Sequence, residues 1–287
     1  DESLAECEES DLLQLDISAL ASLRAQRHLG KTQNALTGNI ARLSSGLRIN
    51  KSADDASGLA ISDELRAYTR GLKQAERNAN DGISAVQTAE GALNELGGIV
   101  TRMRELAVQA ANEGTMDTTE RGYLDQEFQL LESELNRIVS VTEYNGHKLI
   151  DGNMSTGIEY QGGMRNTSGD RIGITVNDHD STSLGLNDEA LNTASNAQAA
   201  ITSLDTALQT INTTRGTLGA TQNRLEMTIS NLGVMHENNA AGNSRLKDVD
   251  VAEESAAMSR SQILSQAGTS VLAQANQLPQ SALSLIG

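Results

Sequence analysis

The sequence has few large aromatic side chains and almost no proline. In 287 residues there is no tryptophan, one phenylalanine (Phe128), four tyrosines and one proline (Pro279). A compact domain normally buries many aromatic rings, because they supply much of the apolar area of its core. Leucine, isoleucine, alanine and polar residues with few helix breakers are instead typical of narrow helical bundles.

Cysteine and long hydrophobic segments are also scarce. Cys7 is the single cysteine, which excludes an internal disulfide and a cysteine-rich metal site. No apolar run approaches the ~18 residues that a membrane-spanning helix needs, and the first residues lack the basic and apolar regions of a secretory signal. We therefore expect a soluble chain without membrane insertion and without a cleavable secretory signal.

The formal net charge is −16, and much of it lies at the start of the chain. Seven acidic side chains and no basic one occur in the first sixteen residues. We treat residues 1–15 as an acidic lead of undetermined origin. No basic patch interleaved with aromatic residues follows, so nucleic acid is not expected as a partner.

The clearest periodicity lies between residues 201 and 232, where apolar residues recur at alternating intervals of three and four. This spacing is typical of a long coiled-coil helix, which at ~1.5 Å per residue would span roughly 48 Å. Only Arg215 and Gln222 interrupt the apolar positions. The apolar positions of this series are Ile201, Leu204, Leu208, Ile211, Leu218, Leu225, Ile229 and Leu232.

Similar apolar spacing predicts further helices at about 18–47, from Ser57 or Gly58 to about 112, and at 119–141. A polar break is expected at 237–243, followed by a final amphipathic helix. Residues 142–190 are rich in glycine, asparagine, aspartate, serine and threonine, and their strand-like runs at 157–161 and 171–176 predict a small β-hairpin. The predicted class is mainly α: an elongated coiled-coil bundle of N- and C-terminal segments with a β-hairpin element between them.

The two terminal helices have apolar stripes that are too thin to support separate cores. Two interpretations stay open at this point. The stripes either contact each other and the same segments of neighbouring subunits, which implies assembly, or they fold back along the central bundle.

The sequence contains no recognisable catalytic or metal-binding constellation. The segment 236–240 begins like a zinc-protease HExxH motif, but Ala240 stands where the second histidine ligand is required. The pairs Asp54-Asp55 and Asp178/Asp180 are better explained by loop solvation and helix capping than by cation binding. The four histidines are spread along the chain at His28, His147, His179 and His236. We therefore expect no enzyme activity, no metal and no cofactor.

Two long motifs at opposite ends of the chain resemble those of bacterial flagellin. The N-terminal motif comprises Leu43–Asn50 (LSSGLRIN), Ala53–Ile61 (ADDASGLAI) and Asn80–Leu93, and the C-terminal motif lies within Met258–Asn276. The resemblance covers roughly residues 16–150 and 190–287. It implies a filament subunit for swimming motility, exported through the flagellar type III apparatus to the cell exterior.

The resemblance also implies a domain organisation and a set of packing residues. After the lead, a filament-core helix and linker would occupy 16–55, followed by bundle segments at 56–141 and 191–240. A short variable hairpin region would lie at 142–190, and the C-terminal filament-core helix at 241–287. The residues expected to pack in the filament core are Leu36, Ile40, Leu43, Leu47, Ile263, Leu264, Val271 and Leu278.

The implied partners are other copies of the chain, an export chaperone that grips the C-terminal helix at about 250–287, and the filament cap and junction proteins. The segment 102–109 resembles the flagellin surface seen by Toll-like receptor 5. If the receptor contacts of that surface are transferred to this sequence, they would be Arg102, Leu106 and, with one inserted residue in the intervening loop, Glu127. The same residues would pack between subunits in a filament.

Three other functions are less consistent with the sequence than a filament subunit. The hook–filament junction protein resembles flagellin at both ends and is the alternative within the family. An adhesin displayed on the filament would need a larger outer domain than the hairpin region offers. An enzyme embedded in the variable region would need the site residues that the sequence lacks.

Overall fold

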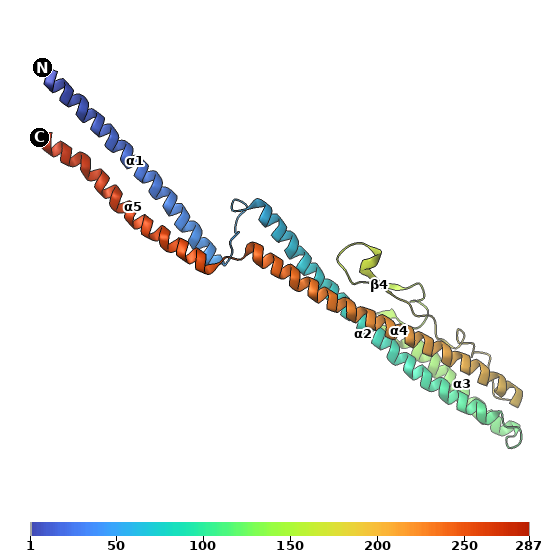
Figure 1. Cartoon of the computed structure of the whole chain (residues 1–287). Helices are drawn as coiled ribbons and strands as arrows, with labels where there is room; N and C mark the ends of the chain where they lie inside the picture. The colour runs from blue at the N-terminus through green and yellow to red at the C-terminus, as the bar shows by residue number, and fades with distance from the viewer. Residues whose placement is uncertain (1, 287) are drawn as a thin grey trace. The chain divides into compact units, whose positions relative to one another are not determined.

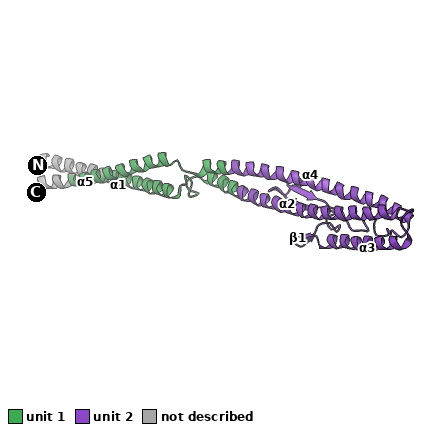
Figure 2. Ribbon diagram, turned by 90° about the horizontal axis from the view of Figure 1, so that it is seen from below, with its two compact units in different colours: residues 1–66, 240–287 green, residues 67–239 purple. Residues whose placement is uncertain are grey.

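The computed structural model describes the backbone of residues 2–286 and the side chains of Leu20 and of residues 22–277. The chain forms two compact units (Figure 2): unit 1 comprises Asp1–Arg66 and Ala240–Gly287, and unit 2 comprises Ala67–Asn239. Helices make up most of both units, which confirms the predicted mainly α class.

Unit 1 consists chiefly of the two terminal helices, α1 (Glu2–Ser45) and α5 (Val251–Ile286), which run side by side (Figure 1). The first turns of α2 (Ala56–Ala110) and the last turns of α4 (Ala194–Lys247) also belong to this unit. Helix α1 begins at Glu2, whereas the sequence predicted a start near residue 18. The backbone of the acidic lead is therefore part of α1, and its side chains lie outside the described residues.

A glycine ends α1 next to residue 47, where the sequence predicted the end of this helix. Gly46 has a φ of +72°, a left-handed conformation that a residue with a Cβ rarely adopts. The two linkers of unit 1 then pair with each other: the Arg48 amide donates to the Lys247 carbonyl at 2.7 Å, and the Val249 amide donates to the Gly46 carbonyl at 3.0 Å. These bonds hold the ends of α1 and α5 together where both helices meet their linkers.

The acidic pair at the start of α2 acts in capping, which agrees with the sequence interpretation. The Asp54 carboxylate accepts hydrogen bonds from the backbone amides of Lys51 and Asn50, and these bonds lower its pKa. The Asp55 carboxylate accepts from the Gly58 amide and the Ser57 hydroxyl, which lowers the pKa of Asp55. Both carboxylates stabilise local backbone and take no part in a larger acidic cluster.

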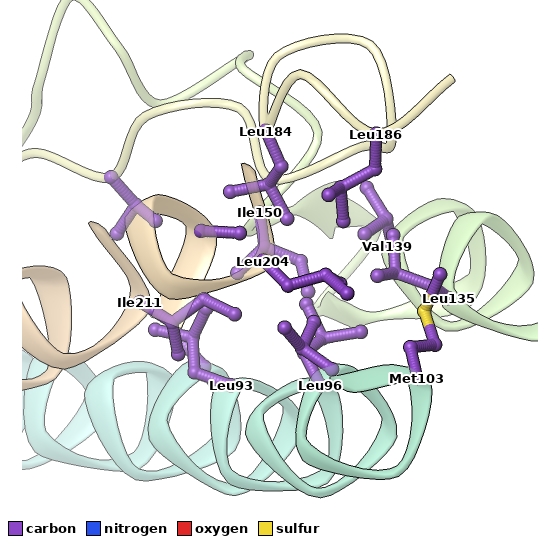
Figure 3. Close-up of a cluster of buried hydrophobic side chains, with 14 of the residues drawn as sticks. Leu93, Leu96, Met103, Leu135, Val139, Ile150, Leu184, Leu186, Leu204 and Ile211 are labelled. Carbon is purple, nitrogen blue, oxygen red and sulfur yellow. The ribbon is translucent and has the colours of Figure 1, made fainter. Parts of the chain in front are cut away.

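Unit 2 is a bundle of α2, α3 (Thr118–Val141) and α4, with the segment between α3 and α4 packed onto it. Asp117 begins α3 with a capping box, because its side chain accepts from the Thr119 and Glu120 amides and Glu120 bonds back to the Asp117 amide. Side chains from all these segments meet in one core (Figure 3). The long seam predicted for α4 is confirmed: every seventh residue from Leu204 to Leu232 is at most 5 % exposed.

The polar break predicted at 237–243 is wrong, because α4 continues to Lys247. Within this segment, Asn243 has a polar partner on α2. The Ser62 hydroxyl is fully buried and donates to the Asn243 side-chain oxygen at 2.7 Å. Helix α4 instead ends beside the linker that contains Asp248.

Two small antiparallel hairpins occupy the region between α3 and α4. The first joins β1 (Glu143–Tyr144) to β2 (His147–Lys148) through Asn145 and Gly146, which both have positive φ, as a tight hairpin turn requires. The second pairs β3 (Ile158–Gln161) with β4 (Arg171–Ile174), preceded by the short 3-10 helix η1 (Ser168–Asp170). The second hairpin was predicted from the sequence, and the first was not.

Candidate functional site

The pairing of α1 with α5 is the first candidate site, because both helices keep apolar residues exposed beside it. Contacts such as Ser22 to Asn276 and Arg42 to Glu254 show an antiparallel arrangement, since one residue number rises as the other falls. Covered positions recur at alternating intervals of three and four on both helices, as in a coiled coil. On α1 this series is Ser22, Ala25, Leu29, Thr32, Leu36, Asn39 and Leu43; on α5 it is Glu254, Met258, Ser261, Ser265, Gly268, Leu272 and Ala275.

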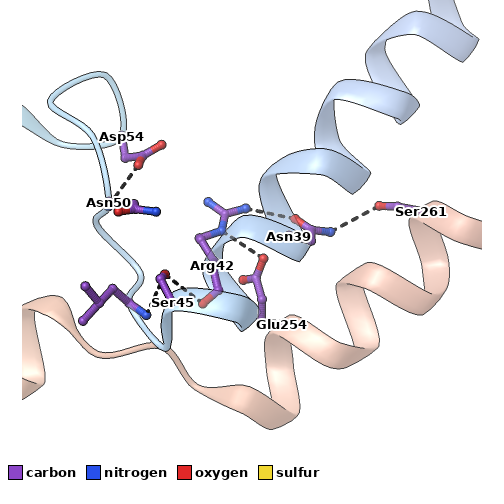
Figure 4. A network of polar contacts seen from close by, with 8 residues as sticks. Asn39, Arg42, Ser45, Asn50, Asp54, Glu254 and Ser261 are labelled. Atoms are coloured by element: carbon purple, nitrogen blue, oxygen red, sulfur yellow. Dashed lines mark hydrogen bonds and ion pairs between the residues drawn. The ribbon is translucent and has the colours of Figure 1, made fainter.

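This seam contains an unusual share of polar groups. Asn39 is 5 % exposed and lies 3.4 Å from the Ser261 hydroxyl, while its side-chain oxygen accepts from Arg42 at 3.0 Å. The Arg42 guanidinium also pairs with the half-buried Glu254 carboxylate at 2.9 Å (Figure 4). Such groups fix the register of a helix pair but add less stability than apolar seam residues would.

Several large apolar side chains of the two helices lie outside the seam and stay exposed. Ile263 is 67 % exposed, Val271 54 % and Leu264 52 %, although α1 already pairs with α5. We call these and their counterparts the outward apolar residues: Leu20, Leu23 and Ile40 on α1, and Val251, Ile263, Leu264 and Val271 on α5. An apolar set of this kind on two paired helices is typical of a surface that another protein covers.

The structure separates the predicted filament-core residues into two groups. Leu36 and Leu43 are half-buried in the α1–α5 seam, and Leu47 is half-buried in the linker, where it pairs with Asp248. The side chain of Leu278 lies outside the described residues. The remaining four, Ile40, Ile263, Leu264 and Val271, belong to the outward apolar residues.

The second candidate surface lies on unit 2 around Arg102. Its guanidinium pairs with Glu105 and Glu127, each at 2.9 Å, and the hydrogen bonds to these two carboxylates raise the Arg102 pKa. All three side chains are well exposed. Two residues further along α2, Arg104 pairs with Asp205 of α4 at 2.6 Å. The structure therefore brings Arg102 and Glu127 together on one accessible surface.

Leu106 does not share this surface. Its side chain is 1 % exposed and belongs to the core of unit 2. Leu106 therefore packs in the bundle core beneath the surface of Arg102, and a direct contact of Leu106 with a receptor stays a prediction. The helical spacing of four residues from Arg102 does not distinguish an exposed neighbour from a buried one.

The structure contains a buried histidine that the sequence interpretation did not single out. His179 is fully buried, with Nδ1 at 2.7 Å from the Asn177 carbonyl and Nε2 at 3.1 Å from the Thr214 hydroxyl of α4. Burial lowers its pKa. Among the described residues there is no group of three histidine, cysteine, aspartate or glutamate side chains that could hold a metal ion. Within the same part of the chain, no helix is long and apolar enough to cross a membrane.

Comparison with known proteins identifies related sequences along most of the chain. Residues 18–155 match the family model for the bacterial flagellin N-terminal helical region, and residues 201–286 match the model for its C-terminal helical region. The chain is 44 % identical to a flagellin of Halalkalibacterium halodurans, in an alignment that covers 93 % of this chain and 97 % of the relative. It is 40 % identical to a flagellin of Bacillus subtilis, covering 93 % and 98 %.

A solved structure of a hook-associated protein from Vibrio parahaemolyticus, described there as putative, shares the fold with a TM-score of 0.54. Only 13 % of the aligned residues are identical, over 68 % of this chain and 98 % of that one. This likeness concerns the fold alone.

Proposed function

The chain belongs to the bacterial flagellin family, and we propose that the outward apolar residues of α1 and α5 are the contacts through which its copies polymerise. It is a structural subunit that self-assembles into the helical filament of the bacterial flagellum. The alternative of a hook–filament junction protein is not favoured, because relatives named flagellin align with 93 % of the chain.

The exposure of Leu264, Val271 and Ile263 carries this proposal. Burying one such side chain stabilises an association by about 1.5–3 kcal/mol, and α1 and α5 present several of them beside a seam that is itself partly polar. Neighbouring copies would cover these residues and would stabilise the α1–α5 pair at the same time. Polymerisation would then stabilise unit 1 far more than unit 2.

The same residues suggest how the chain is kept from polymerising before it reaches the filament. Flagellin homologues form an extracellular filament, and we propose that this chain is exported through the flagellar type III apparatus to the same place. An export chaperone that holds α5, at about 250–287, would shield Ile263, Leu264 and Val271. At the growing end, the cap and junction proteins would contact the chain in place of a neighbouring subunit.

We further propose that the surface of Arg102 and Glu127 serves two uses: subunit packing in the filament and recognition of the monomer by Toll-like receptor 5. The ion pairs of Arg102 are exposed, which favours a polar surface that a partner can reach. The bundle supplies rigidity beneath it through buried side chains such as Leu106. No catalytic role is proposed for any residue, since flagellins are structural proteins.

The proposal is tested by electron microscopy and sedimentation of the purified chain after addition of filament seeds. Wild-type protein is expected to form long filaments, whereas Leu264→Asp and Val271→Asp are expected to stay monomeric, because each places a charge where an apolar contact forms. Ser259→Asp is the matched control, since Ser259 is already polar and exposed on α5. Its filaments should resemble those of the wild type.

All four tyrosines lie in unit 2, so tyrosine fluorescence reports whether that unit remains folded in each variant. Filaments of normal length from Leu264→Asp and Val271→Asp would overturn the assignment of α5 to the polymer contact. A wild-type chain that never polymerises with seeds would overturn the polymerisation proposal itself.

A further inference from the structure

Unit 2 has a second, smaller apolar cluster beside its main core. Leu72 and Ala75 of α2 and Leu232 of α4 form it, and each is at most 5 % exposed. We call these three residues the second cluster. Met164, in the loop between β3 and η1, packs against it and is itself half-buried. A side chain from an irregular loop therefore covers apolar residues of two long helices.

The sulfur of Met164 lies against Gly71 of α2. A Cβ added at Gly71 would come within 2.9 Å of Sδ and 3.1 Å of Cγ of Met164, so the thioether fills the space that a side chain at Gly71 would take. A thioether suits such a gap because it is apolar and its chain is unbranched. An oxygen atom added to this sulfur would be polar, and the second cluster offers it only hydrocarbon side chains.

Polar bonds fix the backbone around Met164. The Gln161 side-chain amide donates to the Gly163 and Arg165 carbonyls, at 2.8 and 2.9 Å. The Arg165 amide donates to the Asp170 carboxylate at 3.0 Å. These bonds lie within the segment 161–170 and keep its shape, so the Met164 side chain attaches a preformed loop to the helices.

Met164 differs from four other methionines of unit 2 because it combines access with packing. Met103 and Met154 are fully buried in the main core, where an oxidant in solution does not reach them. Met227 and Met235 are well exposed on α4, so a change at their sulfur costs no buried contact. Met164 is half-buried: solvent reaches part of the residue while the rest contacts the second cluster.

We propose that Met164 is an oxidation site and that its sulfoxide releases the loop from α2 and α4. The oxidant is a peroxide. A lone pair on Sδ attacks one oxygen of hydrogen peroxide, the O–O bond breaks, and a proton shift turns the other oxygen into water, so that sulfur loses the two electrons that the peroxide gains. The product is a polar sulfoxide that disrupts apolar contacts, and sulfoxide reductases restore the thioether. Unit 2 thus carries a reversible response to oxidants that leaves its main core intact.

Treatment of the purified full chain with hydrogen peroxide, without filament seeds, tests the proposal. Mass spectrometry of peptides measures the fraction of each methionine that becomes sulfoxide. Amide hydrogen exchange measures how often the loop 162–170 and residues 71–75 of α2 open. Oxidised wild type is expected to exchange at least about tenfold faster in both places than untreated protein. Methionine sulfoxide reductases that act on the two sulfoxide epimers should restore slow exchange.

Two substitutions at the same position separate the sulfoxide from other effects of the oxidant. Met164→Leu keeps the apolar contact and cannot form a sulfoxide, so peroxide should leave exchange in its loop unchanged. Met164→Gln places a polar side chain of similar length on the second cluster, and its loop should exchange fast without any oxidant. Met227→Leu is the matched control: Met227 is exposed, so this variant should respond to peroxide as the wild type does. Tyrosine fluorescence during thermal unfolding checks that unit 2 stays folded in every variant.

Three results would each overturn the proposal. If Met164 resisted peroxide while Met227 was fully converted, the Met164 sulfur would be out of reach. If Met164 was converted without faster exchange, its contact with the second cluster would not hold the loop. If Met164→Leu responded to peroxide as the wild type does, the release would come from another methionine. None of these measurements needs filaments, so their outcome is independent of the polymerisation proposal.

Discussion

Leu29 of α1 lies directly over Gly268 of α5, so that a Cβ added at Gly268 would come within 3.2 Å of the Leu29 Cδ1 atom. Glycine in the middle of a helix costs about 0.5–1 kcal/mol relative to alanine. Gly268 is the only glycine of α5, and it lies at a seam position where a side chain would meet Leu29. The absence of a side chain therefore serves the packing of unit 1.

Gly268→Val should weaken the α1–α5 pair. The added side chain has no room beneath Leu29, and overpacking of this kind costs about 1–3 kcal/mol. Amide hydrogen exchange in α1 and α5 is expected to become faster, while exchange in unit 2 stays unchanged. Gly30→Val is the control, since nothing lies within 4 Å of a Cβ at Gly30. Equal exchange rates in the two variants would contradict the close approach.

The Arg42–Glu254 pair should behave as a coupled unit. The Glu254 side chain is 14 % exposed, so removing Arg42 leaves a mostly covered carboxylate without its partner. Arg42→Met is expected to destabilise the helix pair by about 1–3 kcal/mol. The double variant Arg42→Met/Glu254→Met should lose less than the sum of the two single variants. Hydrogen exchange in α1 measures the stability of the helix pair in the wild type, the two single variants and the double variant. If the double variant lost the sum of the two single losses, the ion pair would contribute no coupling.

Much of the fold was predictable because its signals are local. The spacing from Leu204 to Leu232 predicts one long buried stripe, whichever segment packs against it, and these residues are buried in the structure. The glycine-containing break near Gly46 and the capping roles of Asp54 and Asp55 also depend on neighbours within a few residues. Such features are visible in the sequence because short-range geometry decides them.

The partner of each helical face was harder to predict. On α5 the apolar residues Leu264 and Val271 were predicted to pack in the filament core, yet α1 covers positions such as Ser261 and Gly268. Apolarity indicates that a face is covered by something, and the identity of the covering segment depends on contacts far apart in the chain. His179 was missed for the same reason, because only the folding of its loop onto α4 buries it.

Phe128 should be the most sensitive aromatic position. It is the only phenylalanine, it is fully buried, and Phe128→Ala is expected to destabilise unit 2 by about 3–5 kcal/mol. Urea unfolding followed by tyrosine fluorescence isolates unit 2, since all four tyrosines lie there. Leu130→Ala on the same helix is the matched control: Leu130 is 65 % exposed, so its loss should change stability by less than about 0.5 kcal/mol. Similar unfolding midpoints for the two variants would place Phe128 outside the core.

His179 should make unit 2 less stable in acid. Its Nδ1 carries the proton that is donated to the Asn177 carbonyl, so in the neutral ring Nε2 accepts a hydrogen bond from the Thr214 hydroxyl. Burial lowers the pKa of the folded state and outweighs the Asn177 bond and the Asp178 charge, which both raise it. In the unfolded chain a histidine titrates near 6.5.

The sign of the effect follows from the proton balance. Between the depressed folded pKa and about 6.5 the unfolded chain binds more protons than the folded one, so stability is complete above that window and falls as the pH decreases through it. His179→Gln should therefore reduce the loss of thermal stability between neutral and acidic pH, measured by tyrosine fluorescence. His147→Gln, at an exposed position in β2, should keep the wild-type dependence. If His179→Gln lost as much stability in acid as the wild type, the acid sensitivity of unit 2 would have to come from other groups, and the prediction for His179 would be wrong.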